Sequence, residues 1–287
     1  MSVQEALSDV DTWPADAVAA GVLSDGATLT HGDIARMFPL ASVSKLITAH
    51  SVLIAVEEGA FSLDGTVADI NSEYDASVVG PADATVRDLL CHASGVGMQS
   101  RQREKPARSR RIYSSAGYEI LADLVSATGI PFTDYTRAAV CEPLGIPADA
   151  LDLSGSAGHG FRASLSTLLT LAAEFLSPRL LSTQTWDGAL SVQYTELDGI
   201  VPGYGPQHPC PWGLGAEVHG TKSPHWMGQT MPRDVAGHFG QSGTFLWFHR
   251  PTGRAAVVLT DHNFGPWAKE RWDGFNDRLW NELQPSN

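Results

Sequence analysis

The residues best suited to chemistry are a serine and a lysine three positions apart, in the segment Ser42-Val43-Ser44-Lys45. On a helix, side chains at positions i and i+3 share a face, so Ser42 and Lys45 can meet. A serine hydroxyl becomes a good nucleophile only when a neighbouring group accepts its proton. A lysine can accept it if burial and nearby positive potential lower its pKa enough to leave the amine partly neutral. The pair therefore indicates a hydrolase that forms an acyl-enzyme on Ser42.

The same spacing also occurs by chance, as a serine that caps a helix followed by a surface lysine. Residues 42–59 have the periodicity of a helix, with Leu46, His50 and Leu53 on one stripe and Gly59 at the end. The N-terminus of such a helix supplies positive potential near Ser42, and its free N–H can face a developing negative charge. The elements around the pair decide between the two interpretations.

Strand patterns occur at both ends of the chain and helical patterns between them. A hairpin is expected from residues 17–23 and 27–30, and further strands at 212–218, 242–248 and 255–260. The clearest helices are 116–128, 165–176 and 267–283. This order predicts an α/β (α+β) fold in which N- and C-terminal strands form one antiparallel sheet flanked by helices, with a mostly helical insertion. We expect residues 1–66 and 203–287 to form the sheet-containing subdomain, residues 67–202 the helical one, and the active site to lie between them.

Composition limits the classes of partner. The 287 residues carry a formal net charge of −13, which argues against binding to nucleic acid or to an anionic membrane. No run approaches the roughly 18 apolar residues of a membrane span, and the N-terminus lacks the pattern of a signal peptide. Three scattered cysteines indicate reduced thiols in a cytosol. We therefore expect a cytoplasmic enzyme whose partner is a small-molecule substrate; no oligomeric state follows from the sequence.

Patterns for cofactors and for other hydrolase folds are missing. The sequence contains no HExxH motif, no spaced Cys/His set, no phosphate-binding glycine loop and no dinucleotide fingerprint, so neither a metal nor another cofactor is predicted. Gly240-Gln-Ser-Gly-Thr244 lacks the final glycine of a Gly-x-Ser-x-Gly elbow, which argues against an α/β-hydrolase fold.

Five blocks in order surround or follow Ser42. They are Phe38-Pro-Leu-Ala-Ser-Val-Ser-Lys-Leu-Ile-Thr-Ala49, Val86-Arg-Asp-Leu-Leu-Cys-His-Ala-Ser-Gly-Val96, Tyr113-Ser-Ser-Ala-Gly-Tyr-Glu-Ile-Leu121, Trp212-Gly-Leu-Gly215 and Gly237-His-Phe-Gly-Gln-Ser-Gly-Thr244. From about residue 17 to 261, the chain resembles the serine β-lactamase and penicillin-binding-protein superfamily, in its class C-like branch. That branch includes D,D-peptidases, D-amino-acid amidases and esterases.

The resemblance implies a role for each matching position. Ser42 would be the nucleophile and Lys45 its activating partner. Tyr113, at the tyrosine of a Tyr-x-Asn motif, would help to transfer protons, and a cationic lysine nearby could lower its pKa. His238-Phe239-Gly240 matches the Lys/His-Thr-Gly position, and the backbone N–H groups of Ser42 and Gln241 would form the oxyanion hole. Whether Lys45 or Tyr113 is the main base stays open.

Two assignments near these positions have alternatives. Gln241-Ser242-Gly243 could be the third motif instead, but we prefer the register with His238, because Gly243-Thr-Phe-Leu-Trp247 then falls in the family's register. His92 lies in a block where the family uses its histidine structurally, so a structural role is favoured over direct chemistry.

Two departures from the family pattern narrow the substrate. Ser115 replaces the usual asparagine, which contacts the amide carbonyl of β-lactams and peptides, and Phe239 replaces the threonine that helps to hold a substrate carboxylate. We therefore favour hydrolysis of small esters or amides. The alternatives are a β-lactamase, a D,D-peptidase or a D-aminopeptidase, and, from another class, a non-catalytic ligand-binding module of the same fold.

One charge cluster has two interpretations. Six of the nineteen basic residues fall between Arg101 and Arg111. Such a run is typical of a solvated loop, but it could also form a positive lip that attracts anionic substrates to the site.

Overall fold

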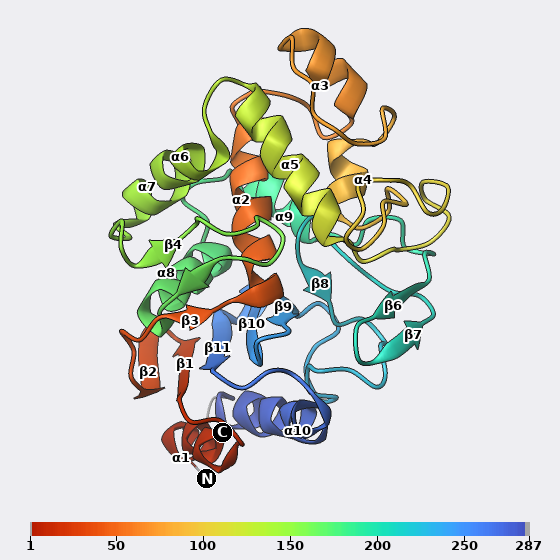
Figure 1. The fold of residues 1–287 in the computed structure, drawn as a ribbon. Coiled ribbons are helices and arrows are strands. Elements are labelled where there is room, and N and C mark those ends of the chain that lie inside the picture. The colour runs from red at the N-terminus through yellow and green to blue at the C-terminus, as the bar shows by residue number, and fades with distance from the viewer. Residues whose placement is uncertain (1, 285–287) are drawn as a thin grey trace.

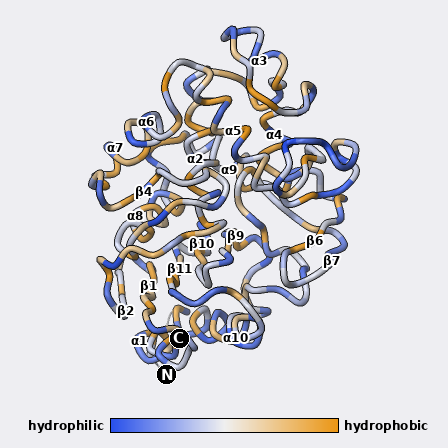
Figure 2. Tube along the Cα trace, in the orientation of Figure 1, coloured by the Kyte–Doolittle hydropathy of each residue, from blue (hydrophilic) through white to orange (hydrophobic). Residues whose placement is uncertain are grey.

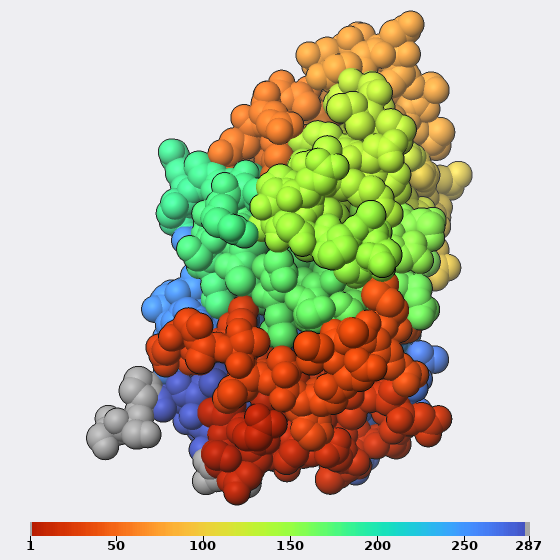
Figure 3. Space-filling view, turned by 90° about the vertical axis from the view of Figure 1, so that its left-hand side faces the viewer, coloured from red at the N-terminus to blue at the C-terminus, as the bar shows by residue number. Residues whose placement is uncertain are grey.

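A six-stranded antiparallel sheet, built from both ends of the chain, forms the centre of the computed structural model, which describes residues 2–284 (Figure 1). Its strand order is β2-β1-β11-β10-β9-β8. The strands are β1 (Val18–Ser24), β2 (Ala27–Gly32), β8 (Glu217–Val218), β9 (Ala236–Gly240), β10 (Thr244–His249) and β11 (Arg254–Thr260). The space-filling view accordingly shows N-terminal and C-terminal residues together at one end (Figure 3). The predicted fold class is confirmed.

Alternate side chains of the strands enter two separate hydrophobic cores. On β10, Leu246 and Phe248 belong to one core, and Phe245 and Trp247 to the other. The first core contains α2 (Ser44–Glu57) and α8 (Leu165–Leu176), and the second contains α1 (Val3–Ser8) and α10 (Pro266–Glu282). Because both faces are covered, β10 and β11 are buried along their whole length and are mostly apolar (Figure 2). Packing on both faces therefore holds the strands of the sheet, including β9 near its edge, in fixed positions.

Shorter elements occupy the middle of the chain. The remaining helices are α3 (Val67–Glu73), α4 (Val86–Leu90), α5 (Ser115–Ala127), α6 (Phe132–Thr136), α7 (Glu142–Leu144) and α9 (Thr183–Leu190), with a π-helical turn η3 (Arg137–Cys141) and 3-10 turns η1 (Asp9–Thr12), η2 (Ala41–Val43) and η4 (Arg250–Thr252). Two small sheets pair β3 (Phe38–Pro39), β5 (Arg162–Ala163) and β4 (Leu151–Asp152), and β6 (Gly199–Val201) with β7 (Gly205–Gln207). Helix α5 packs against α2, and α8 against β1 and β11. The predicted division at residues 66 and 202 remains a prediction.

Three predicted elements begin at least two residues later in the structure than expected. The helix expected from residue 42 begins at Ser44, because residues 41–43 form the tighter 3-10 turn η2. The strand expected at 212–218 covers only Glu217–Val218, since Gly215 has a φ of +105° and turns the chain before them. The strand expected from 242 begins at Thr244, after a turn in which Gly243 has a φ of +76°. In each case a local turn shortens a regular element.

The cysteines and the helices of the described residues relate to the compartment expected from the sequence. Cys91, Cys141 and Cys210 are all buried free thiols. Across residues 2–284, every helix falls short of the length and apolar character that a bilayer-crossing segment needs.

Asn276 of α10 is a buried polar bridge whose loss we expect to destabilise the fold. Its Oδ1 accepts a hydrogen bond from Trp247 Nε1 at 2.9 Å, and its Nδ2 donates to the Trp226 carbonyl at 3.0 Å. Replacement by alanine leaves both partners buried and unpaired, so Asn276→Ala should lower the free energy of unfolding by about 3 kcal/mol. Urea unfolding followed by tryptophan fluorescence measures this. The matched control is Asn281→Ala, an exposed position on the same helix, which should change it by less than about 0.5 kcal/mol; equal effects of the two variants would contradict the assignment.

Candidate active site

The Ser42–Lys45 pair lies where a strained turn enters the central helix. Ala41, in η2, has a φ of +45°, a left-handed conformation that is uncommon for a residue other than glycine. This turn presents Ser42 to a cavity, and α2 then carries Lys45 inward. The distance from Lys45 Nζ to Ser42 Oγ is 3.3 Å. The structure thus brings the two side chains into hydrogen-bonding contact.

Lys45 is fully buried and has no carboxylate partner within ion-pair distance among residues 2–284. Its Nζ donates to the Gly158 carbonyl at 2.6 Å and to Ser115 Oγ at 3.0 Å. Burial lowers the pKa of Lys45 to about 7, although the negative charge of Glu119 raises it in part. A neutral amine has two N–H donors, which satisfy Gly158 and Ser115, and one lone pair, which is left for the Ser42 hydroxyl. Lys45 can therefore accept the serine proton.

Tyr113 borders the same pair but has the opposite pKa shift from the one expected. Lys45 Nζ lies 4.6 Å from the centroid of its ring. Burial raises the pKa of the Tyr113 phenol, and a hydrogen bond with Ser42 only partly offsets this effect. The expected lowering does not occur because the desolvation of the phenol itself is the largest effect on its pKa, and the negative charge of Glu217 adds to it. Tyr113 is therefore a neutral hydroxyl that can donate to, and accept from, a neighbour.

His92 supports Tyr113 from behind. Its Nδ1 accepts a hydrogen bond from the backbone N–H of Ser114 at 3.1 Å, immediately before α5 begins. The imidazole lies 4.7 Å from the Tyr113 ring and 4.8 Å edge-on from Trp212. Burial lowers its pKa well below the ordinary value, so it stays uncharged. These contacts agree with the structural role favoured for His92.

His238 is an uncharged acceptor at the edge of the sheet. On β9, its Nδ1 is 2.7 Å from the Phe239 carbonyl oxygen, which can only accept, so Nδ1 carries the hydrogen and Nε2 a lone pair. Nε2 is buried and has no hydrogen-bond partner in the part of the chain that the structure describes. Burial lowers the pKa of His238 to about 3. Gln241 follows at the turn after the strand, an arrangement that favours His238 over the alternative register for the third motif.

Phe239 is directed away from the catalytic pair. Its ring belongs to the core beneath the sheet and packs within 6 Å of Tyr204, Phe264 and Trp272. No hydroxyl is available at this position to bind a substrate carboxylate, as the sequence predicted.

A close approach between β9 and η2 depends on Gly240. A Cβ at position 240 would collide with the carbonyl oxygen of Leu40, so only glycine fits. Next to it, Ser242 Oγ donates to the Pro39 carbonyl at 2.7 Å, and Thr244 Oγ1 to the Leu40 carbonyl at 3.1 Å. These contacts hold the backbone at Ser42 beside the backbone at residue 241.

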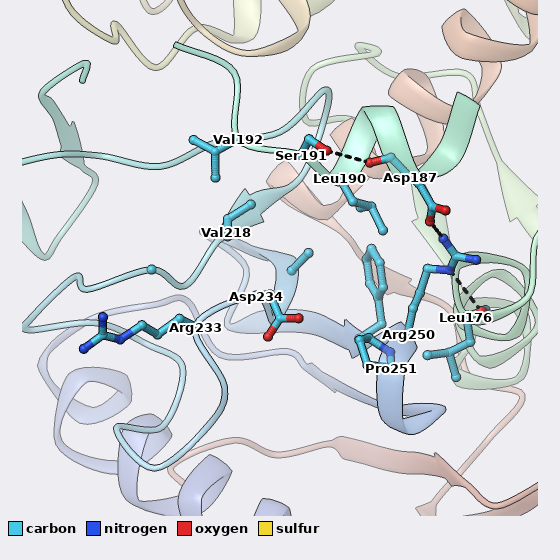
Figure 4. A pocket seen from close by; sticks show the side chains of 13 residues that line it. Leu176, Asp187, Leu190, Ser191, Val192, Val218, Arg233, Asp234, Arg250 and Pro251 are labelled. Carbon is cyan, nitrogen blue, oxygen red and sulfur yellow. Dashed lines mark hydrogen bonds and ion pairs between the residues drawn. The ribbon is translucent and has the colours of Figure 1, made fainter. Parts of the chain in front are cut away.

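The predicted residues converge on a cavity of about 250 Å³. It is lined by Ser42, Tyr113, Ser115, His238 and Gln241, with Lys45 buried behind Ser42 and Ser115. A larger cavity of about 750 Å³ lies elsewhere, around Ala236, Phe248 and the ion pair between Asp187 and Arg250 (Figure 4). None of the predicted site residues borders it. The smaller cavity is therefore the candidate active site.

One buried charge cluster beside this cavity was not anticipated. Glu217 of β8 lines the cavity wall, and its carboxylate accepts hydrogen bonds from His225 Nε2 and Trp226 Nε1, each at 2.8 Å. Lys222 Nζ lies 3.3 Å from the same carboxylate. Burial acts to raise the pKa of Glu217, but the charges of Lys222 and His225 lower it overall. These residues lie within ten positions of one another, but those after β8 belong to no helix or strand, so no periodicity indicated that they meet; the sequence offered only the scarcity of lysine as a signal.

The described residues offer no ready metal centre. Within residues 2–284, no group of three or more His, Cys, Asp or Glu side chains is arranged to hold a metal ion.

Fold and site together define a serine hydrolase fold of the β-lactamase and penicillin-binding-protein type. The beta-lactamase family model matches residues 17–276, so the chain belongs to the beta-lactamase family. A structure of a beta-lactamase from Mycobacterium bovis is 41% identical, with a TM-score of 0.89, over 97% of this chain and 99% of that one. A comparison with curated protein sequences found no match.

Two more distant structures share the fold. The structure of SurE with D-Leu has 21% identity and a TM-score of 0.74, over 98% of this chain and 74% of that one. A mutant of simvastatin synthase (LovD) from Aspergillus terreus has 16% identity and a TM-score of 0.72, over 97% and 95% of the two chains.

The lowered pKa of Lys45 can be measured directly, because the chain has only four lysines. In protein labelled with 13C at lysine Cε, one resonance should titrate with a midpoint near pH 7, since the buried amine loses its proton there. Lys45→Met should remove that resonance and leave the other three. A midpoint above pH 9 for the resonance that Lys45→Met removes would contradict the burial argument.

Proposed function

We propose that the protein hydrolyses small esters or amides through an acyl-enzyme on Ser42, with Lys45 as the proton acceptor. The observation that carries this proposal is the contact of 3.3 Å between Ser42 Oγ and an amine whose pKa burial lowers to about 7. A group with this pKa is close to half neutral at pH 7, which suits it both to accept and to return a proton. The beta-lactamase family membership supports the same assignment.

The proposed reaction has two proton-balanced halves. Lys45 takes the Ser42 proton while Ser42 Oγ bonds to the substrate carbonyl carbon, and the backbone N–H groups of Ser42 and Gln241 stabilise the oxyanion. The Lys45 ammonium then returns the proton to the leaving alcohol or amine, which departs and leaves the acyl-enzyme. In the second half, water attacks the acyl carbon and gives a proton to Lys45; as the bond to Ser42 Oγ breaks, Lys45 returns that proton to Oγ and the acid leaves. Tyr113, as a neutral hydroxyl hydrogen-bonded to Ser42, relays the proton between Lys45 and the leaving atom.

Two features support a small ester or amide over a β-lactam. His238 is uncharged, and Phe239 is directed into the core, so neither supplies a cation or a hydroxyl for a carboxylate. Ser115 Oγ is already engaged by Lys45 Nζ.

A second candidate is β-lactam hydrolysis. The M. bovis structure described as a beta-lactamase is 41% identical over nearly the whole chain, which favours it. Nitrocefin distinguishes the two candidates, because turnover comparable with that of short 4-nitrophenyl esters would establish the β-lactamase. We expect esters to be the better substrates.

The identity of the nucleophile can be tested with a fluorophosphonate probe. Intact-protein mass should show a single adduct on the wild type and none on Ser42→Ala, because Ser42 is the proposed nucleophile: its Oγ contacts the Lys45 amine at 3.3 Å, and its own backbone N–H would help to form the oxyanion hole. The matched control is Ser44→Ala in the same turn; its hydroxyl accepts a hydrogen bond from the Phe161 N–H and does not contact Lys45, so labelling should persist. Hydrolysis of 4-nitrophenyl acetate should fall at least about a thousandfold in Ser42→Ala. Ester turnover that survives Ser42→Ala would contradict the proposal, and the absence of any adduct would favour a ligand-binding module.

The base can be identified from the pH profile of Tyr113→Phe. We expect its kcat/KM to fall about a hundredfold, because the proton relay is lost. The rate should still rise with pH to a plateau above about 7, since Lys45 is neutral there and protonated below. If Tyr113 were the base, the rise would occur at higher pH in the wild type, because burial raises the phenol pKa, and would vanish in the variant.

A further inference from the structure

A second cavity continues from the candidate active site. It has a volume of about 390 Å³ and shares Met98, Tyr113 and Pro202 with the cavity that contains Ser42. Its outer part is formed by the loop between α4 and α5, which is hydrophilic in Figure 2. A substrate bound at Ser42 can therefore extend past Tyr113 into this space.

The basic cluster of this loop is mostly neutralised within the protein. Three arginines are ion-paired: Arg101 with Asp123 at 2.6 Å, Arg103 with Asp83 at 2.8 Å, and Arg108 with Asp88 at 3.1 Å. Arg111 is buried and donates to backbone carbonyls, among them that of Cys91 at 2.8 Å. These four residues are occupied in holding the loop.

Lys105 and Arg110 are the two exceptions. Among residues 2–284, neither side chain has an ion-pair or hydrogen-bond partner, and both line the second cavity. Glu104 is the one acidic residue in its lining, so the cavity carries a net positive charge on a protein whose formal charge is −13. Local positive potential on an acidic protein concentrates anions at that spot and not over the rest of the surface.

The rest of the cavity wall is apolar and exposed. Met98 and Ile200 are 48% and 53% exposed, and both belong to the small set of large apolar side chains that remain open to solvent. Ile112 adds to the same wall. Apolar surface between the nucleophile and two unpaired cations fits an arm that is apolar along its length and anionic at its end.

We propose that this cavity is a specificity site, in which Met98 and Ile200 contact an apolar arm of the substrate and Lys105 and Arg110 bind its terminal carboxylate. The proposal rests on the function proposed above and names the class of substrate for it. It also gives the site the cation that its third motif lacks, because His238 is uncharged.

Matched ester pairs test the charge requirement. The first pair is the 4-nitrophenyl monoester of adipic acid and its methyl ester, which place the carboxylate on the acyl arm. The second is the acetate ester of 4-(3-carboxypropyl)phenol and its methyl ester, which place it on the leaving arm. In one pair, wild-type kcat/KM should favour the carboxylate at least tenfold, and the preference should shrink as salt rises from 20 to 500 mM, because salt screens exposed charges.

Variants then assign the preference to its residues. Lys105→Gln and Arg110→Gln should each reduce the carboxylate preference severalfold, and the double variant should bring it near one, with unchanged turnover of the neutral esters. The matched control Arg101→Gln removes a positive charge of the same loop outside the cavity, and should keep the preference.

The outcomes separate this inference from the proposed function. Neutral esters hydrolysed without any carboxylate preference, or a preference that the double variant retains, would overturn the inference and leave the hydrolase intact. No hydrolysis of any ester, together with no labelling of Ser42, would overturn both.

Discussion

The burial of one lysine is the constraint on which the site depends. Lys45 is among the largest fully buried side chains of the protein, and its amine contacts hydroxyl and carbonyl oxygens and two tyrosine rings instead of water. Desolvation of an ammonium is costly, and without a carboxylate beside it the group yields its proton easily. A carboxylate in contact would restore the ordinary pKa and remove the base. The buried carboxylate of Glu217 instead lies beside Lys222 and His225, whose positive charges compensate it. Separating the two buried lysines keeps one reactive and the other structural.

The fold excludes solvent from Lys45 and fixes the Ser42 turn and strand β9 next to it. Helix α2 is buried along nearly its whole length, in the core that lies on one side of the sheet. The second core on the other side fixes β9 and β10, so the third motif cannot shift relative to the Ser42 turn. Gly240, Ser242 and Thr244 then lock the two backbones together. The left-handed Ala41 is a strained conformation that such packing can maintain. The reactivity proposed for Ser42 would therefore depend on packing on both faces of the sheet.

The sequence predicted the parts of this arrangement that depend on local pattern. Helix α8 and the hairpin of β1 and β2 follow from periodicity and turn residues, and the motif blocks brought Ser42, Tyr113 and His238 into one proposed site. Properties created by tertiary burial escaped it. The raised pKa of Tyr113 reflects the burial of its own phenol, which spacing does not encode. The Glu217 cluster depends on how the irregular segment after the edge strand β8 turns back toward it, and no helix or strand periodicity predicts such a turn.

The family pattern allows a positive charge at the third motif, on β9, but here the unpaired positive charges near the cavity belong to Lys105 and Arg110, on the loop between α4 and α5. His238 is neutral, and the ring of Phe239 packs in the second core, which contains α1 and α10. Changing either residue to restore an anion site would disturb the packing that holds β9. The loop between α4 and α5 has no such restriction, because four of its basic residues already fix it and Lys105 and Arg110 make no internal bonds within the described residues. Loops on a rigid scaffold can change their side chains at little cost to the fold. Substrate selection can therefore vary at this loop while the Ser42–Lys45 chemistry and the sheet behind it stay constant.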